Sequence, residues 1–258
     1  MYSAKGIAAS GLRKQQTRIE TIANNIANLN TTAFKAARLD FKDSMYVNGF
    51  SPAPARTPEG HQQKGHGVLN AGITTDFSPG TIIRTERELD LAIENEGFFA
   101  IGDLIGNTFY TRNGNFGLSA EPGGTFLVNA EGLYLQDMTG ARIQVPEGTH
   151  RIDIGTNGAI SFAIGDTIQP GATIGIFTFR NLAGLESVGS SNFAETESSG
   201  DRLPAEEARV RQGTLEGSNV SLADEMARLL RTQRAFSLAS RALTTADEME
   251  GIANNMRR

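Results

Sequence analysis

The stretch SNVSLADEMARLLRTQRAFSLASRALTTADEMEGIANNMRR, residues 218–258, sets the pattern around which the rest of the chain is organised. It contains no Pro, and after Leu222 its one Gly is Gly251. Apolar side chains recur every seven residues at Leu222, Leu229, Phe236 and Leu243, with Met226, Gln233 and Ser240 between them. Apolar residues at this spacing share one face of a helix. The stretch therefore predicts a long amphipathic helix.

The expected helix has recognisable ends and an unusual length. Ser221, followed three residues later by Asp224, resembles a capping box, and Arg257 and Arg258 suit a helix C-terminus. About 35 helical residues would span about 50 Å, whereas a mean helix has about 12 residues. An amphipathic helix that simply covers a middle domain is one interpretation. The length favours a helix with a long partner.

A second stripe of apolar residues occupies residues 1–30. Its seven-residue repeat is formed by Leu12, Ile19 and Ile26, with Ala8, Gln15, Ile22 and Leu29 at the companion positions. Such a pattern is typical of a coiled-coil seam, here interrupted by one polar residue. Asn24 and Asn25 come too early to be explained by helix termination alone, because Asn competes with the helical backbone for hydrogen bonds. The two stripes lie at opposite ends of the chain, and we expect them to pair.

The residues that follow this stripe leave the heptad pattern. Residues 31–50 contain apolar anchors such as Phe34 and Tyr46 and could hold a short helix. Residues 51–72 are rich in Pro and Gly, which indicates a loop or an extended arm rather than a core element. His61 and His66 fall in this arm five residues apart, which is a poor signal for a metal site.

From about Ile73 to Leu215 the chain alternates short apolar runs with turn residues. The runs are 81–85, 89–93, 98–101, 108–111, 125–129, 133–136, 142–145, 152–154, 159–164, 172–179 and 208–215. The dipeptides Asn113-Gly114, Gly123-Gly124 and Asn157-Gly158 are strong hairpin or tight-turn signals. This rhythm predicts an all-β sandwich or barrel-like domain. The polar residues 186–206 are expected to form a loop or an extended connection.

These patterns together predict an α+β fold. Its long N- and C-terminal helices pair as a coiled coil, and a mainly antiparallel all-β domain is inserted between them. The expected division is a helical domain from residues 1–35 and 216–258, a connecting arm at 36–80 and a β-rich domain at 81–215.

Composition excludes several classes of function. The formal net charge is −5, without the basic patch that nucleic-acid binding requires. Cys is absent, which removes disulfides and thiolate metal ligands. No apolar run reaches the 18 residues of a membrane-spanning helix, and the N-terminus lacks the apolar core of a cleaved signal peptide. We expect no membrane insertion, no metal and no cofactor.

No motif in the sequence indicates catalysis. The segment GHGVLN (65–70) lacks the third Gly of a phosphate-binding loop, and no G-x-S-x-G, Walker or H-E-x-x-H pattern occurs. The acidic segment ELDLAIENE (88–96) could hold a carboxylate pair, but its alternation is more typical of a half-buried strand. We therefore expect that the protein is not an enzyme.

Four ordered blocks resemble a known family. They are ANNIANLNTTAFK (23–35), RELDLAIENEGFF (87–99), YTRNGNF with LVNAEG (110–116 and 127–132), and RQGTLEGSNVSLADEMARLLRTQRAFSLASRAL (211–243). They resemble signature segments of the axial proteins of the bacterial flagellum, the rod and hook family. Length and the long arm are most similar to its distal rod members. Proximal rod members and shorter hook-like members are the alternatives.

The chain departs from the family pattern at two places. The family usually has Gly immediately before Phe34, where this chain has Ala33. If that Gly supplies a positive φ, Ala33 must be strained or the turn must differ. In addition, Glu94-Asn95-Glu96 replaces a segment that more often begins with a Gly-containing turn.

The resemblance implies a structural subunit of the basal-body rod. It would self-assemble into a hollow helical drive shaft, with the terminal helices in an inner layer and the β domain in an outer layer. The implied partners are copies of itself, other rod and hook axial proteins, the surrounding basal-body rings and the flagellar export apparatus. The implied location is the basal body, across the periplasm or cell wall, reached by type III export without a cleaved signal peptide. A soluble binding module built on the β domain, or a carbohydrate-active enzyme with paired carboxylates, is the alternative from another class.

The side chains expected at the assembly interface come from both stripes and from the Asn-rich segment, where polar residues would set the register between neighbouring copies. They are Leu12, Ile19, Ile22, Asn24, Asn25, Ile26, Asn28, Leu29, Phe34, Leu222, Met226, Leu229, Gln233, Phe236 and Leu243.

Overall fold

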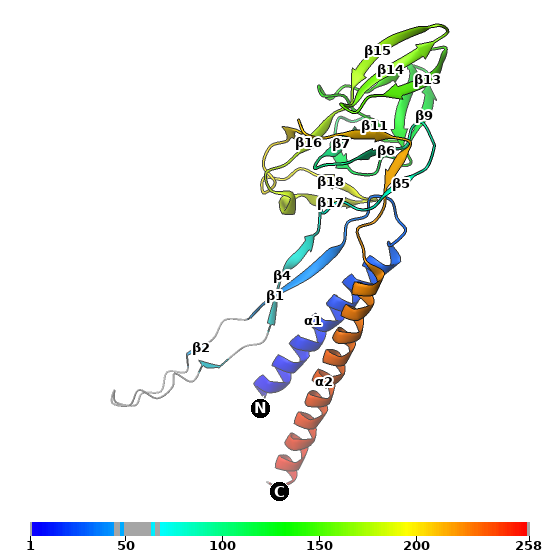
Figure 1. Cartoon of the computed structure of the whole chain (residues 1–258). Helices are drawn as coiled ribbons and strands as arrows, with labels where there is room; N and C mark the ends of the chain where they lie inside the picture. Colours follow the sequence, from blue (N-terminus) through cyan, green and yellow to red (C-terminus); the bar gives the residue numbers. More distant parts are fainter. Residues whose placement is uncertain (1, 44–46, 49–62, 65–67, 257–258) are drawn as a thin grey trace. The chain divides into compact units, whose positions relative to one another are not determined.

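The computed structural model describes residues 2–43, 47–48, 63–64 and 68–256 and separates into two compact units (Figure 1). The helical unit comprises Met1–Ala27, Ala37–Thr75 and Ser221–Arg258. The β unit comprises Asn28–Ala36 and Asp76–Val220. The fold is α+β, as the sequence predicts, and each unit is assembled from segments that are distant in the chain.

The helical unit contains two long helices and a two-stranded ladder. Helix α1 (Tyr2–Ala27) runs antiparallel to helix α2 (Leu222–Asn255), and the two contact each other (Figure 1). Strand β1 (Ala37–Asp43) pairs antiparallel with β4 (Val68–Thr75), and the short strands β2 (Val47–Asn48) and β3 (Gln63–Lys64) also pair antiparallel. Among the residues the structure describes, neither helix is both long enough and apolar enough to cross a membrane.

The strand β1 corrects the expectation of a short helix within residues 31–50. Arg38 and Asp40 are exposed on either side of the buried Leu39, which is the two-residue period of a strand. The partner strand β4 begins at Val68, so the end of the segment expected to be a loop or an extended arm is extended and paired. His61 and His66 lie outside the described residues.

Helix α2 begins as predicted. The Ser221 side chain accepts a hydrogen bond from the Asp224 N–H at 3.5 Å, and Asp224 and Glu225 place negative charge in the first turn. The last turn ends at Asn255, and Arg257 and Arg258 lie outside the described residues.

The face of α2 that is covered in this unit differs in one respect from the predicted stripe. Leu229 and Leu243 are half-buried on it, as expected. The position that shares this face lies three residues after Leu229, at the buried Thr232. The predicted position, four residues after Leu229 at Gln233, is exposed. Glu225 and Met226 show the same contrast, with 3% and 51% of the residue exposed.

Every strand pairing described in the β unit is antiparallel, which confirms that prediction. The large sheet follows the order β12-β10-β11-β7-β8-β18-β17, with β9 paired to β10, β16 paired to β7, and β19 paired to β16. Its strands are β7 (Phe98–Gly102), β8 (Thr108–Thr111), β9 (Phe116–Glu121), β10 (Gly124–Asn129), β11 (Tyr134–Leu135), β12 (Gln144–Val145), β16 (Ile176–Thr178), β17 (Glu186–Gly189), β18 (Asn192–Ala194) and β19 (Leu203–Pro204).

Smaller ladders complete the unit. A three-stranded sheet is formed by β13 (Thr149–Ile154), β14 (Ala159–Ile164) and β15 (Thr167–Thr173). Strand β20 (Val210–Gln212) pairs with β6 (Leu91–Ile93), and β21 (Thr214–Glu216) pairs with β5 (Ile82–Arg84). The last two ladders bring the end of the β unit back to its beginning. A short 3-10 helix, η1, covers Leu182–Gly184.

The structure revises several details of the strand prediction. The polar segment 186–206 contains β17, β18 and β19 rather than a loop, because Phe193 anchors β18 in the core with 5% exposure. The hairpin signals at 123–124 and 157–158 are confirmed by the pairs β9–β10 and β13–β14. Asn113-Gly114 instead joins two strands that do not pair with each other. A Cβ at Gly114 would lie 1.8 Å from the Leu91 carbonyl oxygen, so only Gly fits there.

The core of the β unit lies on both faces of β7. Phe99 and Ile101 belong to a mainly aliphatic cluster that includes Leu135. Phe98 and Ala100 point to an aromatic cluster with Tyr110. Because successive side chains of a strand point to opposite faces, burial of the entire strand produces the continuous apolar run seen in the sequence.

Candidate functional site: a buried ion network and two faces of helix α2

A carboxylate held between two cations lies at the end of β21. Glu216 is 1% exposed. Its Oε1 accepts hydrogen bonds from Lys35 Nζ at 2.7 Å and from the Gly80 N–H at 2.8 Å, and its Oε2 accepts from Arg112 Nε at 2.6 Å. The side chains of both cations are almost fully buried as well. Such charges are tolerated inside a protein only when they are paired and hydrogen-bonded.

The other donors of the two cations are also used. Arg112 donates from one terminal nitrogen to the Gly97 carbonyl at 3.1 Å and from the other to the carbonyls of Ile93 and Asn95, both at 3.0 Å. Lys35 Nζ donates to the Ser78 carbonyl at 2.7 Å. The planar guanidinium can reach three carbonyls and a carboxylate at once because its five donors point outward in one plane.

Burial and pairing act in opposite directions on the acid of this network. Burial by itself raises the pKa of Glu216, but the Arg112 guanidinium, the Lys35 ammonium and the Gly80 N–H outweigh it, so the pKa of Glu216 lies below its ordinary value. Burial lowers the pKa of Lys35, and the attraction of Glu216 offsets that effect only in part. The network is therefore held by charge as well as by hydrogen bonds.

The side chain of Asn219 and the backbone N–H of Ala33 extend the network to the segment 28–36. Asn219 accepts from the Ala36 N–H at 2.7 Å and donates to the carbonyls of Asp76 at 2.8 Å and Ser78 at 3.1 Å. The Ala33 N–H donates to the Glu216 carbonyl at 2.8 Å. Five stretches of chain, around residues 33–36, 76–80, 93–97, 112 and 216–219, are thereby joined inside the β unit.

Ala33 takes the strained backbone conformation that its position suggests. It is buried, and its φ of 55° lies in the left-handed region, which favours Gly. The expectation attached to this departure from the family pattern is confirmed in its first form, since Ala33 itself takes the strained positive φ. The other departure is also accommodated, since Asn95 donates from its side chain to the Glu207 carbonyl at 2.8 Å.

The residues of this network are not among the functional residues predicted from the sequence. Lys35, Arg112, Glu216 and Asn219 each lie within one of the four family-like blocks. Their signal was a charged or amide side chain directly beside apolar or Gly residues, as in Phe34-Lys35 and Leu215-Glu216. This signal is weak, because Lys, Arg and Glu are almost never fully buried unless they are paired, and the pairing partners are distant in the sequence.

In the helical unit, Asn25 has a partner within its own chain. It is 1% exposed, its Nδ2 donates to the Ala37 carbonyl at 2.9 Å, and its Oδ1 accepts from the Ala37 N–H at 2.9 Å. These bonds fasten the end of α1 to the first residue of β1. Asn25 thus has hydrogen-bond partners within its own chain, and a contact with neighbouring copies stays a prediction. Asn28 accepts from the Thr31 hydroxyl at 3.1 Å, and the side chain of Asn24 is exposed.

The remaining predicted interface residues fall into two groups by exposure. Those at least half-buried are Leu12, Ile19, Ile22, Ile26, Leu29, Phe34, Leu229 and Leu243. Those exposed are Leu222, Met226, Gln233 and Phe236. The structure describes one chain, so an interface between copies stays a prediction for both groups.

Helix α2 carries a second apolar face, which we call the outer face. It consists of exposed side chains, which are Met226, Leu230, Leu238, Met249, Ile252 and Met256. At about 100° per residue, five of these side chains fall on the side of the helix opposite Leu229, Thr232 and Leu243, and Met226 lies between the two faces. Leu238 is 66% exposed and Leu230 is 57% exposed. A helix that is apolar on two sides needs cover on both.

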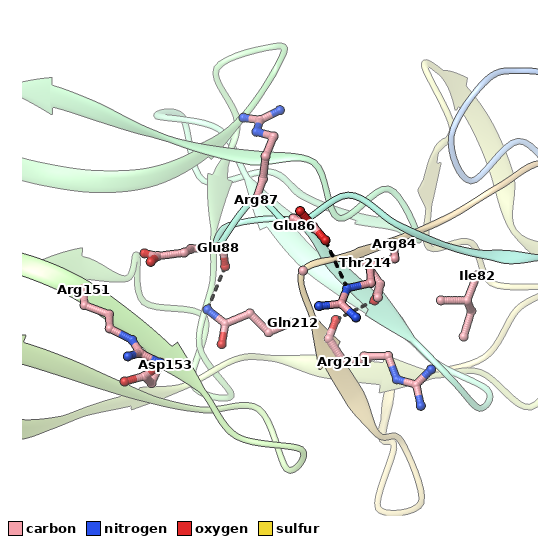
Figure 2. A pocket seen from close by; sticks show the side chains of 11 residues that line it. Ile82, Arg84, Glu86, Arg87, Glu88, Arg151, Asp153, Arg211, Gln212 and Thr214 are labelled. Atoms are coloured by element: carbon pink, nitrogen blue, oxygen red, sulfur yellow. Dashed lines mark hydrogen bonds and ion pairs between the residues drawn. The ribbon is translucent and has the colours of Figure 1, made fainter.

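A polar hollow of about 480 Å³ lies in the β unit (Figure 2). Its charged side chains have partners of opposite sign nearby: Arg151 lies 2.8 Å from Asp153, and Arg84 lies 3.8 Å from Glu86. Figure 2 also shows Gln212, which donates to the Glu88 carbonyl at 2.8 Å. In the part of the chain that the structure describes, no group of three or more acidic or His residues could hold a metal ion.

The acidic segment 88–96 forms structure rather than a catalytic pair. Leu91, Ala92 and Ile93 form β6 and are all buried, so the strand is covered on both faces rather than on one. Asp90 is buried and lies 3.8 Å from Arg87. The preference for a strand at this segment is confirmed, although its expected half-burial is not.

Comparison with known families decides the relationship. Residues 7–35 match the model described as "Flagella basal body rod protein", residues 92–162 match "Flagellar hook protein FlgE/F/G D1 domain", and residues 211–256 match "Flagellar basal body rod FlgEFG protein C-terminal". A relative from Borreliella burgdorferi, "Flagellar basal-body rod protein FlgG", is 38% identical across 100% of both chains. The chain belongs to the flagellar basal-body rod protein family.

Other relatives agree with this assignment. The FlgG rod protein of Bacillus subtilis is 38% identical over 96% of this chain and 97% of its own. The "Flagellar hook-basal body complex protein FlhP" of the same organism is 28% identical over 97% of both chains. These relatives are structural flagellar proteins rather than enzymes. The three matched segments contain Lys35, Arg112 and Glu216, so each contributes one charge to the buried network.

Proposed function

We propose that this protein, a structural subunit of the flagellar basal-body rod, polymerises into a hollow helical shaft that transmits torque and conducts exported subunits. The observation that carries the proposal is the outer face of α2. Side chains such as Leu230 and Leu238 are exposed in the single chain although burying such side chains is favourable by about 1.5–3 kcal/mol each. Neighbouring copies would supply the cover.

The proposed arrangement places the terminal helices at the centre of the shaft. Helices α1 and α2 pair as a coiled coil within an inner layer formed by residues 1–35 and 216–258. Residues 36–80 form a connecting arm, and residues 81–215 form the outer domain. Support comes from the contact between α1 and α2 and from the half-buried Leu12, Ile19, Leu229 and Leu243.

The proposed interface combines the predicted residues with the outer face of α2. The exposed Leu222, Met226, Gln233 and Phe236 would contact neighbouring copies directly. The partners are copies of this chain, other rod and hook axial proteins, the rings of the basal body and the export apparatus. The rod would span the periplasm or cell wall, after export without cleavage of a signal peptide.

Assembly is tested by placing charge on the outer face. We expect the double variant L230E/L238E to fold with an unchanged free energy of unfolding, within about 0.5 kcal/mol, because both side chains are exposed. It should fail to form rods in isolated basal bodies viewed by electron microscopy, and the cells should be non-motile. The matched control is I168E, which changes an exposed Ile of the β unit and should leave rods intact. Normal rods containing L230E/L238E would contradict the proposal.

A further inference from the structure

A groove with a basic rim lies within the helical unit, between α1, α2 and β1. It has a volume of about 210 Å³, and the buried Ile22 and Leu39 are among its apolar lining residues. Arg18, Arg38 and Arg228 also line it. A hollow of about 490 Å³ shares Arg18 and Arg228 and continues along the helices past Arg231. We call the two together the basic groove.

The basic groove also contains buried acceptors that lack donors. The Glu225 side chain is 4% exposed, and its Oε1 accepts from Arg228 at 2.6 Å. Its Oε2 has no hydrogen-bond partner in the described part of the chain, and neither does the buried Oε1 of Gln15. A buried polar atom without a partner costs about 1–3 kcal/mol, so a donor that entered the groove and paired with these acceptors would be favoured.

The far end of α2 has the complementary chemistry. Residues 247–256, the α2 tail, carry acidic side chains at Asp247 and Glu248. Their exposed apolar side chains are Met249, Ile252 and Met256, which share one helix face by their spacing of three, four and seven. Asn254 and Asn255 add amide donors. An apolar stripe with acidic and amide flanks matches a groove that has an apolar floor, a basic rim and unpaired acceptors.

The tail that fits this groove must belong to another copy. Helix α2 is continuous from Leu222 to Asn255, and about 19 residues, or about 28 Å, separate Arg228 from the start of the α2 tail. A rigid helix cannot fold back over that distance. Helix α2 has 34 residues and α1 has 26, and the end of α2 extends past the start of α1 (Figure 1). The α2 tail is therefore presented for an external contact.

We propose that the α2 tail of a second copy docks in the basic groove. The proposal rests on the rod-subunit function and adds the contact that sets the spacing of copies along a shaft. A groove and a tail on different surfaces make a heterologous contact, which repeats from copy to copy without closing on itself when the rotation does not close. Arg18, Arg38, Arg228 and Arg231 would face the acidic side chains of the incoming tail.

Site-directed crosslinking tests this contact directly, because the chain has no Cys and any disulfide must come from introduced residues. R38C and M249C are prepared as separate variants, mixed, assembled and oxidised. We expect R38C–M249C dimers in the mixture, at least tenfold above the yield from either variant alone. The control mixture is I168C with M249C, which should give background yield. Rods that form without the R38C–M249C dimer would overturn the proposal.

A charge exchange provides a second readout that does not depend on disulfide geometry. R38E alone and E248R alone should each raise the critical concentration for polymerisation about tenfold, and the combined variant should recover most of that loss. R180E, an exposed Arg of the β unit, should have no effect. Equal losses in single and combined variants would overturn the tail contact. Failure of the unmodified protein to polymerise would instead contradict the rod-subunit proposal itself.

Discussion

The β unit and the helical unit each bury a glutamate side chain, and they differ in how completely its carboxylate is hydrogen-bonded. In the β unit, Glu216 is buried among Lys35, Arg112 and Gly80, and both carboxylate oxygens are hydrogen-bonded. In the helical unit, Glu225 is equally buried, but one oxygen lacks a partner and an apolar face of α2 is exposed. Asp90 Oδ1 and Gln136 Oε1 of the β unit also lack hydrogen-bond partners, so the contrast between the units rests on the pairing of these two carboxylates and on the exposed apolar face of α2.

The largest expected effect comes from removing the carboxylate of the ion network. E216A leaves Lys35 and Arg112 buried without their counter-charge, which should cost about 3–5 kcal/mol. Denaturant unfolding followed by a probe in the β unit measures this loss. The matched variant is E225A, which should cost about 1 kcal/mol or less, because its partner Arg228 is about one-third exposed. Equal losses in E216A and E225A would remove the proposed contrast between the units.

Acid should reproduce part of the E216A effect. The folded-state pKa of Glu216 lies below its ordinary value of 4.5, so its contribution to stability is complete above about pH 4.5 and is lost as the pH falls through the folded-state pKa. Protonation keeps a hydrogen-bonding group in place, so the loss should be smaller than in E216A. The free energy of unfolding, measured from pH 6 to pH 2.5, should fall less steeply in E216Q than in the unmodified protein. Parallel pH profiles would show that Glu216 is not the titrating group.

A smaller effect is expected where α1 is fastened to β1. N25A removes two hydrogen bonds to Ala37 and should destabilise the helical unit by about 2 kcal/mol. Hydrogen exchange of the backbone amides in α1 and β1 measures this change without reference to the β unit. Q16A, on the exposed side of the same helix, should change protection by only a few tenths of a kcal/mol. If N25A proves as mild as Q16A, the bonds to Ala37 do not hold this segment.

The smallest change should be a gain. A33G relieves a left-handed φ of 55° and should stabilise the β unit by about 0.5–1 kcal/mol, after allowing for the greater freedom of Gly in the unfolded chain. Denaturant unfolding of A33G measures the gain. E86G, at an exposed residue with a φ of 64°, should shift stability in the same direction. A loss of more than 1 kcal/mol in A33G would show that packing of the Ala33 methyl group stabilises the β unit by more than the backbone strain costs.

Regular patterns were the predictable part of this molecule. The heptads at Leu12–Ile19–Ile26 and Leu222–Leu229 placed both helices, and apolar runs placed most strands, because periodicity reflects which face is buried. Segments whose pairing depends on distant residues were not predictable in this way. Strand β1 exists because β4 pairs with it, and β18 is held by the single buried Phe193 in a polar segment.

The candidate site was predictable only in outline. Spacing cannot show that Lys35, Arg112 and Glu216 meet, since 77 and 104 residues of chain separate the successive members. The spacing also cannot show which residues between the heptad positions face the partner helix. Residues three and four positions apart both lie near the helix–helix contact. This is why Thr232 rather than Gln233 lies on the covered face of α2.

The central claim is that the β unit is ordered in the single chain, whereas the helical unit is completed by assembly. Amide hydrogen exchange, compared between the dilute monomer and assembled rods, tests it most directly. The account predicts strong protection of β7 and β21 in both states, with protection of α2 residues 238–256 rising at least a hundredfold on assembly. Equal, strong protection of these α2 amides in the monomer and in the rods would contradict it.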